Sequence, residues 1–149
     1  MISQKARYAF RALFTLAKAG QGEALLIANI SDQAEIPRKF LEQILLDLKR
    51  AGYVMSRRGK IGGYYLLKQP GEIFFGDVLR LIDGPVAPLP CLSKIAYRRC
   101  EDCKDERSCE IRRVFGRVAD ATRAVLDTTS LGSILSEDLQ DISDSYLKA

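Results

Sequence analysis

Histidine is absent from the 149 residues of this chain. The chain therefore cannot form a Ser-His-Asp or Cys-His nucleophile system, and it cannot bind zinc or haem through imidazole. The sequence also lacks a phosphate-binding G-x-x-x-x-G-K-S/T loop and a strand-flanked G-x-G-x-x-G motif. These absences predict that the protein is not an enzyme.

Long apolar runs and a leader segment are also missing. No stretch approaches the roughly 20 apolar residues of a membrane-spanning helix. The opening residues, MISQKARYAF, lack the apolar core and cleavage site of a signal peptide. We therefore expect a cytoplasmic protein with no membrane partner. In that compartment the 4 cysteines are expected to be metal ligands or redox groups rather than structural disulfides.

Positive charge is concentrated in the first part of the chain. Residues 1–84 carry 13 Lys/Arg and 8 Asp/Glu, a balance of +5, whereas residues 85–149 carry 10 and 11, a balance of −1. This asymmetry favours a DNA-binding head followed by a part that does not bind DNA. Ordinary variation in charge along a sequence can produce a similar asymmetry, so charge alone does not establish that the head binds DNA.

Apolar residues at helical spacing predict three helices, over residues 3–18, 26–34 and 37–51. Pro37 suits the first turn of the third helix, and Gly52 suits its end. The predicted buried stripe of the third helix is Phe40, Leu41, Ile44, Leu45 and Leu48. Its predicted outer face is polar and carries Arg38, Lys39, Glu42, Gln43, Asp47 and Arg50. Two such helices joined by a tight turn are typical of a helix-turn-helix, although any helical hairpin in a small α domain gives this pattern.

A basic hairpin is predicted directly after these helices. Residues 53–57 and 63–67 have strand character, and the sequence RGKIG lies between them. A hairpin with glycines at its bend and cations at its tip is typical of the wing of a winged helix, because a thin positive finger can enter the minor groove beside the helix in the major groove.

Two further helices are predicted, over residues 74–83 and 107–126. The second repeats apolar residues over about five turns, namely Ile111, Val114, Phe115, Val118, Ala121, Thr122, Val125 and Leu126. Pairing with a second copy would cover this stripe, and packing against residues 3–18 is the other possibility. Thr128 or Thr129 is expected to cap a last short helix that ends at Leu135.

The predicted fold is mainly α with a small β hairpin. It comprises a winged helix-turn-helix head (1–84), a cysteine-rich sensor loop (85–106), a dimerisation helix with a short helix (107–135) and a flexible tail (136–149).

The four cysteines form the pattern C-x8-C-x2-C-x5-C, at Cys91, Cys100, Cys103 and Cys109. Neighbouring cations are expected to lower their pKa values, and these cations are Arg98, Arg99, Lys104 and Arg107. The pattern is compatible with a structural zinc site, a disulfide or sulfenate switch, an iron–sulfur cluster or inert thiols. A small redox enzyme using the C-x-x-C at Cys100 is disfavoured, because no βαβ context surrounds it.

The sequence resembles the family of regulators that includes the iron–sulfur cluster assembly regulator IscR, the nitric-oxide sensor NsrR, the rhizobial iron regulator RirA and the cysteine-metabolism regulator CymR. The resemblance runs from Met1 to about Leu135 and includes the cysteine loop. Its other marks are KARYA (5–9), IPRKFLEQIL (36–45), RRGKIGGYYLL (57–67), FGDV (75–78), IDG (82–84) and TSL (129–131).

This resemblance implies a homodimeric winged-helix repressor or activator that binds a double-stranded operator. It implies an iron–sulfur cluster, 2Fe-2S in preference to 4Fe-4S, held by Cys91, Cys103 and Cys109. Two relatives take their fourth ligand at places that here hold Arg112 and Tyr8, so Cys100 becomes the candidate fourth ligand. Because some members lack a cluster, a thiol-switch or zinc-bearing regulator of the same fold is the alternative.

The predicted DNA contacts fall in three groups. Arg38, Lys39, Glu42 and Gln43 are expected to face the major groove, where Gln43 and Arg38 can donate to base edges and Glu42 can accept from cytosine. The wing is expected to act through Arg57, Arg58 and Lys60. Candidate phosphate contacts on the first helix are Lys5, Arg7 and Arg11.

Overall fold

The computed structural model describes residues 2–137. Six α-helices, one two-stranded antiparallel sheet and two short 3-10 turns make up this part of the chain. The helices are α1 (Gln4–Ala19), α2 (Ile27–Ala34), α3 (Arg38–Arg50), α4 (Phe75–Asp83), α5 (Glu110–Leu126) and α6 (Leu131–Ser136). The strands are β1 (Val54–Arg57) and β2 (Gly63–Leu66), and the 3-10 turns span Pro70–Glu72 and Pro90–Leu92. The prediction of a mainly α fold with a β hairpin is confirmed.

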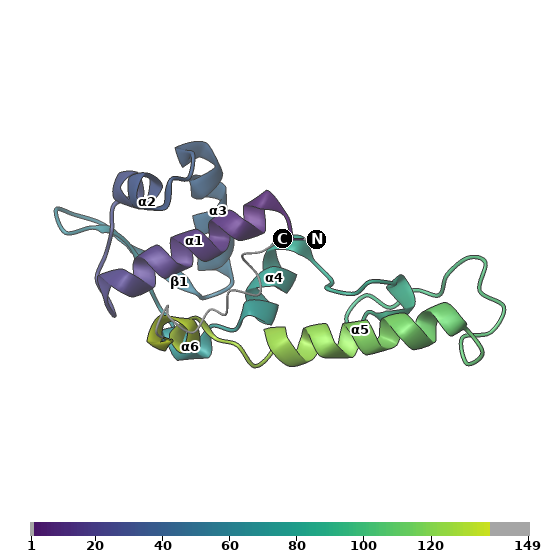
Figure 1. The fold of residues 1–149 in the computed structure, drawn as a ribbon. Helices are drawn as coiled ribbons and strands as arrows, with labels where there is room; N and C mark the ends of the chain where they lie inside the picture. The colour runs from purple at the N-terminus through teal and green to yellow at the C-terminus, as the bar shows by residue number, and fades with distance from the viewer. Residues whose placement is uncertain (1, 138–149) are drawn as a thin grey trace.

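Helix α1 lies at the centre of the head and contacts α2, α3, α4 and β2 (Figure 1). Its buried face alternates small and large residues, namely Ala6, Ala9, Phe10, Ala12, Leu13 and Leu16. Alanines at a helix interface let neighbouring backbones approach closely, while leucines fill the space between them. The core continues into α3 through Leu41, Ile44, Leu45 and Leu48, all of which are 0% exposed.

The turn between α2 and α3 sets the helix-turn-helix geometry. Glu35 adopts a left-handed conformation with φ 51°, and the Ile36 amide donates to the Ser31 carbonyl over 3.0 Å. The Ser31 hydroxyl donates to the Ile36 carbonyl over 2.7 Å. Pro37 follows as the N-cap of α3, where its missing N–H is not needed. Helix α3 therefore begins at a fixed angle to α2.

The hairpin is held to the head by backbone contacts. Strand β1 pairs with β2 in the register Val54 to Leu66 and Arg57 to Gly63. Leu25 forms an isolated bridge with Tyr64, with both amides donating over 2.8 Å. This bridge holds β2 one residue from the turn and leaves residues 58–62 projecting from the head (Figure 1).

Helix α5 projects away from the head as an arm, with the cysteine loop lying along it (Figure 1). The chain then returns to the head, because the Leu131 amide donates to the Ile73 carbonyl over 2.9 Å. The Phe75 amide donates to the Thr129 carbonyl over 3.0 Å, and Phe74 bridges Ser130. Leu131 is fully buried, so α6 packs on the head.

Two predicted helix boundaries were wrong. Helix α5 begins at Glu110 and not at Arg107, because the Asp105 carboxylate accepts from the amides of Arg107 and Ser108 and turns the chain there. Ser130, not Thr128 or Thr129, caps α6, and its hydroxyl accepts from the Ser133 amide over 3.1 Å.

The hydroxyls of Thr128 and Thr129 donate back into α5, to the carbonyls of Ala124 and Val125. Most of the predicted flexible tail, residues 138–149, lies outside the described residues. Within residues 2–137, none of the helices has the length and apolar character to cross a membrane.

Candidate nucleic-acid interface and cysteine loop

The outer face of α3 presents all four side chains predicted to meet the major groove. Arg38, Lys39, Glu42 and Gln43 are exposed. Arg38 Nε lies 3.6 Å from Glu42 Oε1, one turn further along the helix. Gln43 Nε2 donates to Asp47 Oδ1 over 2.9 Å. These contacts between exposed groups contribute little stability, so the side chains can exchange them for base edges.

Phe40 was predicted to be buried, and this prediction was wrong. Its side chain is 58% exposed. Phe40 lies at the margin of the buried stripe, where α3 faces the beginning of α1 rather than the core. Its ring makes an edge contact with Tyr8, with ring centroids 6.3 Å apart and planes at 61°.

The predicted phosphate contacts on α1 differ in their partners. Lys5 Nζ lies 2.8 Å from Asp47 Oδ2, and this hydrogen bond holds the pKa of Asp47 below its usual value. Arg11 pairs with Glu35 over 3.2 Å. Arg7 is exposed and forms no ion pair with any residue between 2 and 137. Lys5 therefore links α1 to α3 in addition to lying at the predicted interface.

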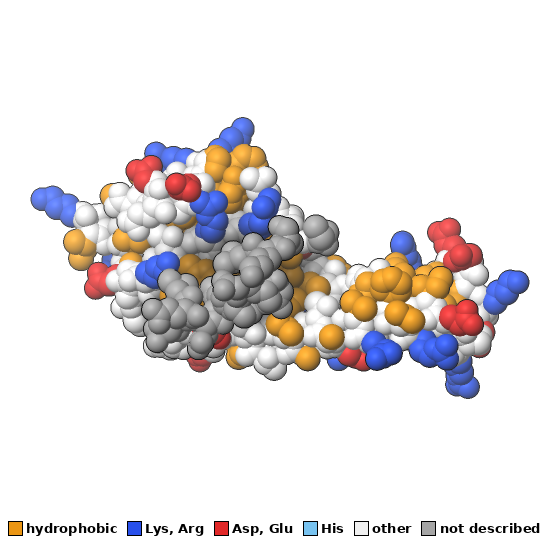
Figure 2. Space-filling model, viewed as in Figure 1, with side chains coloured by type: hydrophobic (Ala, Val, Ile, Leu, Met, Phe, Trp, Pro, Cys, Tyr) orange, Lys and Arg blue, Asp and Glu red, His pale blue; other side chains and the backbone are white. Residues whose placement is uncertain are grey.

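The hairpin tip carries exposed cations. Arg58 and Lys60 are exposed and have no ion-pair partner in the described part of the chain. Figure 2 shows Lys and Arg side chains projecting at the hairpin end of the head. Arg57 instead stacks on Tyr65, 4.9 Å from the ring centroid, and donates to the Gly22 carbonyl over 3.1 Å. The structure thus anchors Arg57 at the end of β1 and leaves the other two in the turn that follows.

The cysteine loop brings two of its four thiols together. Cys91 is buried, and its thiol lies next to that of Cys100. The Cys103 amide donates to the Cys100 carbonyl over 3.1 Å, which closes a tight turn. Cys109 is the N-cap of α5, and its sulfur accepts from the Arg112 amide over 3.4 Å. Among residues 2–137 no three Cys, Asp or Glu side chains are gathered as they would be around a metal ion.

The electrostatics of the loop differ in part from expectation. Partial burial and the adjacent Cys91 thiol raise the pKa of Cys100, so the predicted lowering is wrong for this residue. The guanidinium of Arg99 donates to the carbonyls of Cys103 and Lys104 over 3.0 and 2.8 Å. Arg99 thus braces the turn at Cys103.

Arg112 is the cation closest to the cysteines along α5. It donates to the Cys91 carbonyl over 3.5 Å, at the limit of a hydrogen bond. Its Nε is buried and has no hydrogen-bond partner among the described residues. A buried donor without an acceptor costs about 1–3 kcal/mol, so this position is suited to an additional acceptor.

Residues 2–137 match the model of the Rrf2 family, described as iron-dependent transcriptional regulators. The chain belongs to the Rrf2 family. It is 46% identical over 139 residues to an rrf2-like HTH-type transcriptional regulator of Rhodobacter capsulatus, covering 91% of this chain and 93% of the relative. It is 31% identical over 144 residues to IscR of Aliivibrio salmonicida, covering 96% and 82%.

Among solved structures, CymR, the global cysteine regulator of B. subtilis, matches with a TM-score of 0.74 and 33% identity, over 93% of this chain and 98% of CymR. The family resemblance inferred from the sequence is therefore confirmed. This Rrf2-family protein is a DNA-binding transcriptional regulator, and the prediction that it is not an enzyme is confirmed by its relatives.

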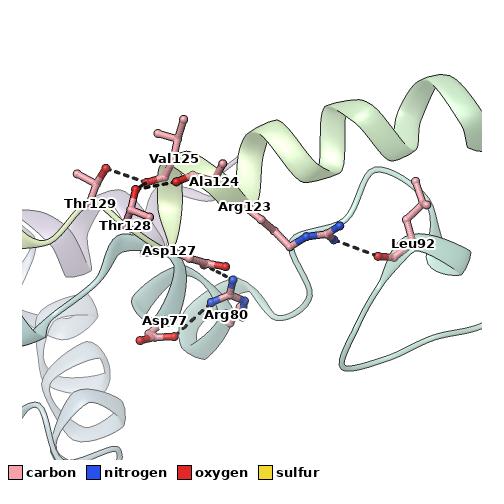
Figure 3. A network of polar contacts seen from close by, with 9 residues as sticks. All are labelled: Asp77, Arg80, Leu92, Arg123, Ala124, Val125, Asp127, Thr128 and Thr129. Carbon is pink, nitrogen blue, oxygen red and sulfur yellow. Dashed lines mark hydrogen bonds and ion pairs between the residues drawn. The ribbon is translucent and has the colours of Figure 1, made fainter.

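Sequence reasoning missed a polar network that joins the arm of this Rrf2-family regulator to its head (Figure 3). Arg80 of α4 pairs with Asp77 over 3.2 Å and with Asp127, which follows α5. Arg123 of α5 donates to the Leu92 carbonyl of the cysteine loop over 3.4 Å. The two contacts tie α5 to the head at one side and to the cysteine loop at the other.

Proposed function

We propose that this Rrf2-family regulator is a cytoplasmic homodimer whose binding to a two-fold related operator is controlled by a cysteine-ligated iron–sulfur cluster that senses iron, redox state or nitric oxide. One observation carries the proposal. The loop that holds Cys91, Cys100 and Cys103 leads directly, through Cys109, into a helix whose apolar face is exposed. A change at the loop is therefore transmitted to the element that would join two heads.

The DNA side of the proposal assigns the outer face of α3 to the major groove and the wing tip to the minor groove. Arg58 and Lys60 at the tip would contact phosphates or the groove floor, and Lys5 and Arg7 would contact phosphates. Arg58→Ala should weaken operator binding and reduce the salt slope by about one unit. Arg107→Ala, which removes one exposed charge from the cysteine loop, serves as the control and should leave the slope unchanged.

The dimer side rests on the exposed apolar face of α5. This face comprises Ile111, Val114, Phe115, Val118 and Val125, which are 41–63% exposed. Figure 2 shows apolar side chains following one side of the arm. A groove of about 640 Å³ between α4 and α5 includes Ile2, Val86 and Val118 in its lining. Five large apolar side chains in one stripe are typical of a helix that pairs with a second copy.

Val118→Asp should convert the dimer to monomer in sedimentation velocity, because it places a charge in the centre of this stripe. Arg113→Asp changes charge on the polar side of the same helix and should leave the dimer intact. A dimer that survives Val118→Asp would exclude α5 as the joining surface.

The donor chemistry of the loop fits an iron–sulfur cluster. Thiolates are the usual ligands of such clusters, and the chain has no imidazole that could replace them. The orphaned Nε of Arg112 supports the fit, since it lies beside the cysteines and needs an acceptor such as a thiolate or sulfide. Cys91, Cys103 and Cys109 would hold the cluster, with Cys100 as the fourth ligand, and 2Fe-2S is the proposed type. The loop must close further for all four sulfurs to meet.

The cluster supplies a centre that responds to iron supply, oxidants and nitric oxide, and the chain's residues transmit its state. Cys109 caps α5, so fixing its sulfur fixes the first turn of that helix. Arg123 donates to the Leu92 carbonyl, next to Cys91 in the sequence. Arg80 pairs with Asp127, which lies at the C-terminal end of α5, opposite Cys109. Control requires that the two DNA-binding states differ in cluster affinity.

Anaerobic purification tests the cluster. Iron and acid-labile sulfide should co-purify with the brown protein, and Cys91→Ser, Cys103→Ser and Cys109→Ser should each lose most of both. Ser108→Ala, next to Cys109, is the matched control and should retain both. Unchanged iron in the Cys91→Ser and Cys109→Ser variants would refute the ligand assignment. Colourless protein with stoichiometric zinc would indicate a structural zinc site and not an iron–sulfur cluster.

The influence of the Cys91 thiol on Cys100, whose pKa it helps to raise, favours one alternative, a cluster-free disulfide switch. Oxidation by hydrogen peroxide would join the two sulfurs and release two protons and two electrons, which reduce the peroxide to two water molecules. The aerobic protein would then lack iron and show a reversible Cys91–Cys100 disulfide by peptide mass mapping. This alternative is excluded if the protein holds iron and sulfide and if its four thiols can be alkylated only after the cluster is removed.

A further inference from the structure

Phe40 is the large aromatic side chain of α3 that the fold leaves exposed. Its 58% exposure contrasts with the complete burial of Leu41, Ile44 and Leu48 on the same helix. It lies in the first turn of α3, between Lys39 and Leu41, in the segment whose outer face is proposed to meet the major groove. An exposed phenylalanine at this place has no role in the core.

A groove of about 730 Å³ surrounds the ring. It is lined by Gln4, Lys5, Tyr8, Lys39, Phe40 and Gln43, which come from the first turns of α1 and α3. Tyr8 braces the ring at its edge, and Gln4 Nε2 donates to the Tyr8 hydroxyl over 2.7 Å. Phe40 and Tyr8 thus give this groove a mainly apolar, aromatic surface, with Lys5 and Lys39 in its lining.

The charge of the groove around Phe40 indicates which ligand it could bind. Lys39 and the Asp47-paired Lys5 lie in the lining, so the groove suits a ligand that carries anionic groups and is apolar where it meets the Phe40 ring. A duplex strand has this character, because phosphates flank its bases and the only apolar group on the major-groove edges is the C5 methyl of thymine.

We infer that Phe40 reads a thymine methyl group in each half-site of the operator. The inference rests on the proposed placement of α3 in the major groove. It adds an apolar contact to the polar contacts of Lys39 and Gln43, and it assigns Tyr8 as the residue that positions the ring. Discrimination against cytosine at this base would then come from the missing methyl group.

Replacement of thymine by deoxyuridine tests the inference, because it removes only that methyl group. Duplexes are first selected from a random pool with the anaerobically purified full chain, and each thymine is then replaced in turn. Burial of one methyl contributes about 0.8 kcal/mol, so a replacement in one half-site should raise Kd about fourfold, and replacements in both half-sites about fifteenfold. Phe40→Ala should bind the thymine and uracil duplexes equally at that position.

Leu81→Ala removes an exposed apolar side chain from α4 and should retain the thymine preference. Phe40→Leu should retain part of it. The Tm of Phe40→Ala should stay close to that of the parent, since the ring is mostly exposed. The inference is overturned if the parent is indifferent to every thymine methyl, if Phe40→Ala keeps the discrimination, or if Phe40→Ala changes the oligomeric state. Failure to select any duplex would instead reject the DNA-binding placement itself.

Discussion

Adding one methyl group at Gly63 tests whether the wing is held to the head by its backbone. Gly63 has φ 131°, in the region that favours glycine, and a Cβ there would overlap the Leu25 carbonyl and lie 2.8 Å from the Leu26 nitrogen. The overlapped atoms are backbone, so no side-chain rotation relieves the clash. Gly63→Ala must therefore move the hairpin away from residues 25 and 26.

The loss of unfolding free energy can be estimated from the hydrogen bonds that this movement breaks. The bridge between Leu25 and Tyr64 comprises two hydrogen bonds of 2.8 Å. Each contributes about 1 kcal/mol net, and the unfavourable backbone conformation costs a further 1 kcal/mol or so. The expected loss is about 3 kcal/mol of unfolding free energy, which corresponds to roughly 10 °C in Tm.

Urea unfolding followed by circular dichroism, at one fixed protein concentration, measures this loss. Gly71→Ala is the matched control, because a Cβ at Gly71 meets no atom within 4 Å, and it should change stability by less than about 0.5 kcal/mol. Operator binding by Gly63→Ala should also weaken, since the wing loses its anchor. A Gly63→Ala protein as stable as the Gly71→Ala control would refute the backbone-anchor reasoning.

Two further predictions concern ion pairs. Lys5→Met should lower the unfolding free energy by about 0.5 kcal/mol at pH 7, because Asp47 loses its partner at a partly exposed site. The depressed pKa of Asp47 means that this contribution is present above its ordinary pKa of 3.8 and is lost as pH falls through the lower folded-state value. In urea titrations the difference between the two proteins should therefore shrink as the pH is lowered below 3.8. A difference that stays constant over this range would contradict the prediction, and Arg7→Met serves as control. Arg80→Met should increase hydrogen exchange at residues 127–129, because α5 loses its tie to α4, whereas Asp77→Asn should not. Equal exchange in both variants would show that Arg80 does not tie the arm.

Periodicity predicted the helices because their apolar residues recur at helical spacing, and the hairpin followed from strand-forming residues on both sides of a glycine-containing bend. Phe40 escaped this reasoning, since its spacing matches the buried stripe and only the position of α1 decides that it faces Tyr8 and not the core. Arg80 and Asp127 are 47 residues apart, and no local pattern marks them as partners. The cysteine spacing indicated a site but not which thiols meet, because that depends on the turn by which the Arg98 amide reaches the Pro90 carbonyl over 3.2 Å.

The arm formed by residues 85–129 leaves and re-enters the head at the two ends of the same helix. It departs after Gly84, the C-cap of α4, and it returns where Phe74, the N-cap of α4, bridges Ser130. A tilt of the arm would therefore act on both ends of α4. Phe75 of α4 stacks on Phe10 of α1 at a centroid distance of 4.6 Å, and Lys5 of α1 is paired with Asp47 of α3. These contacts connect α4 to α1 and α1 to α3, so under the proposed function a tilt of the arm would reach the helix that is proposed to meet the major groove.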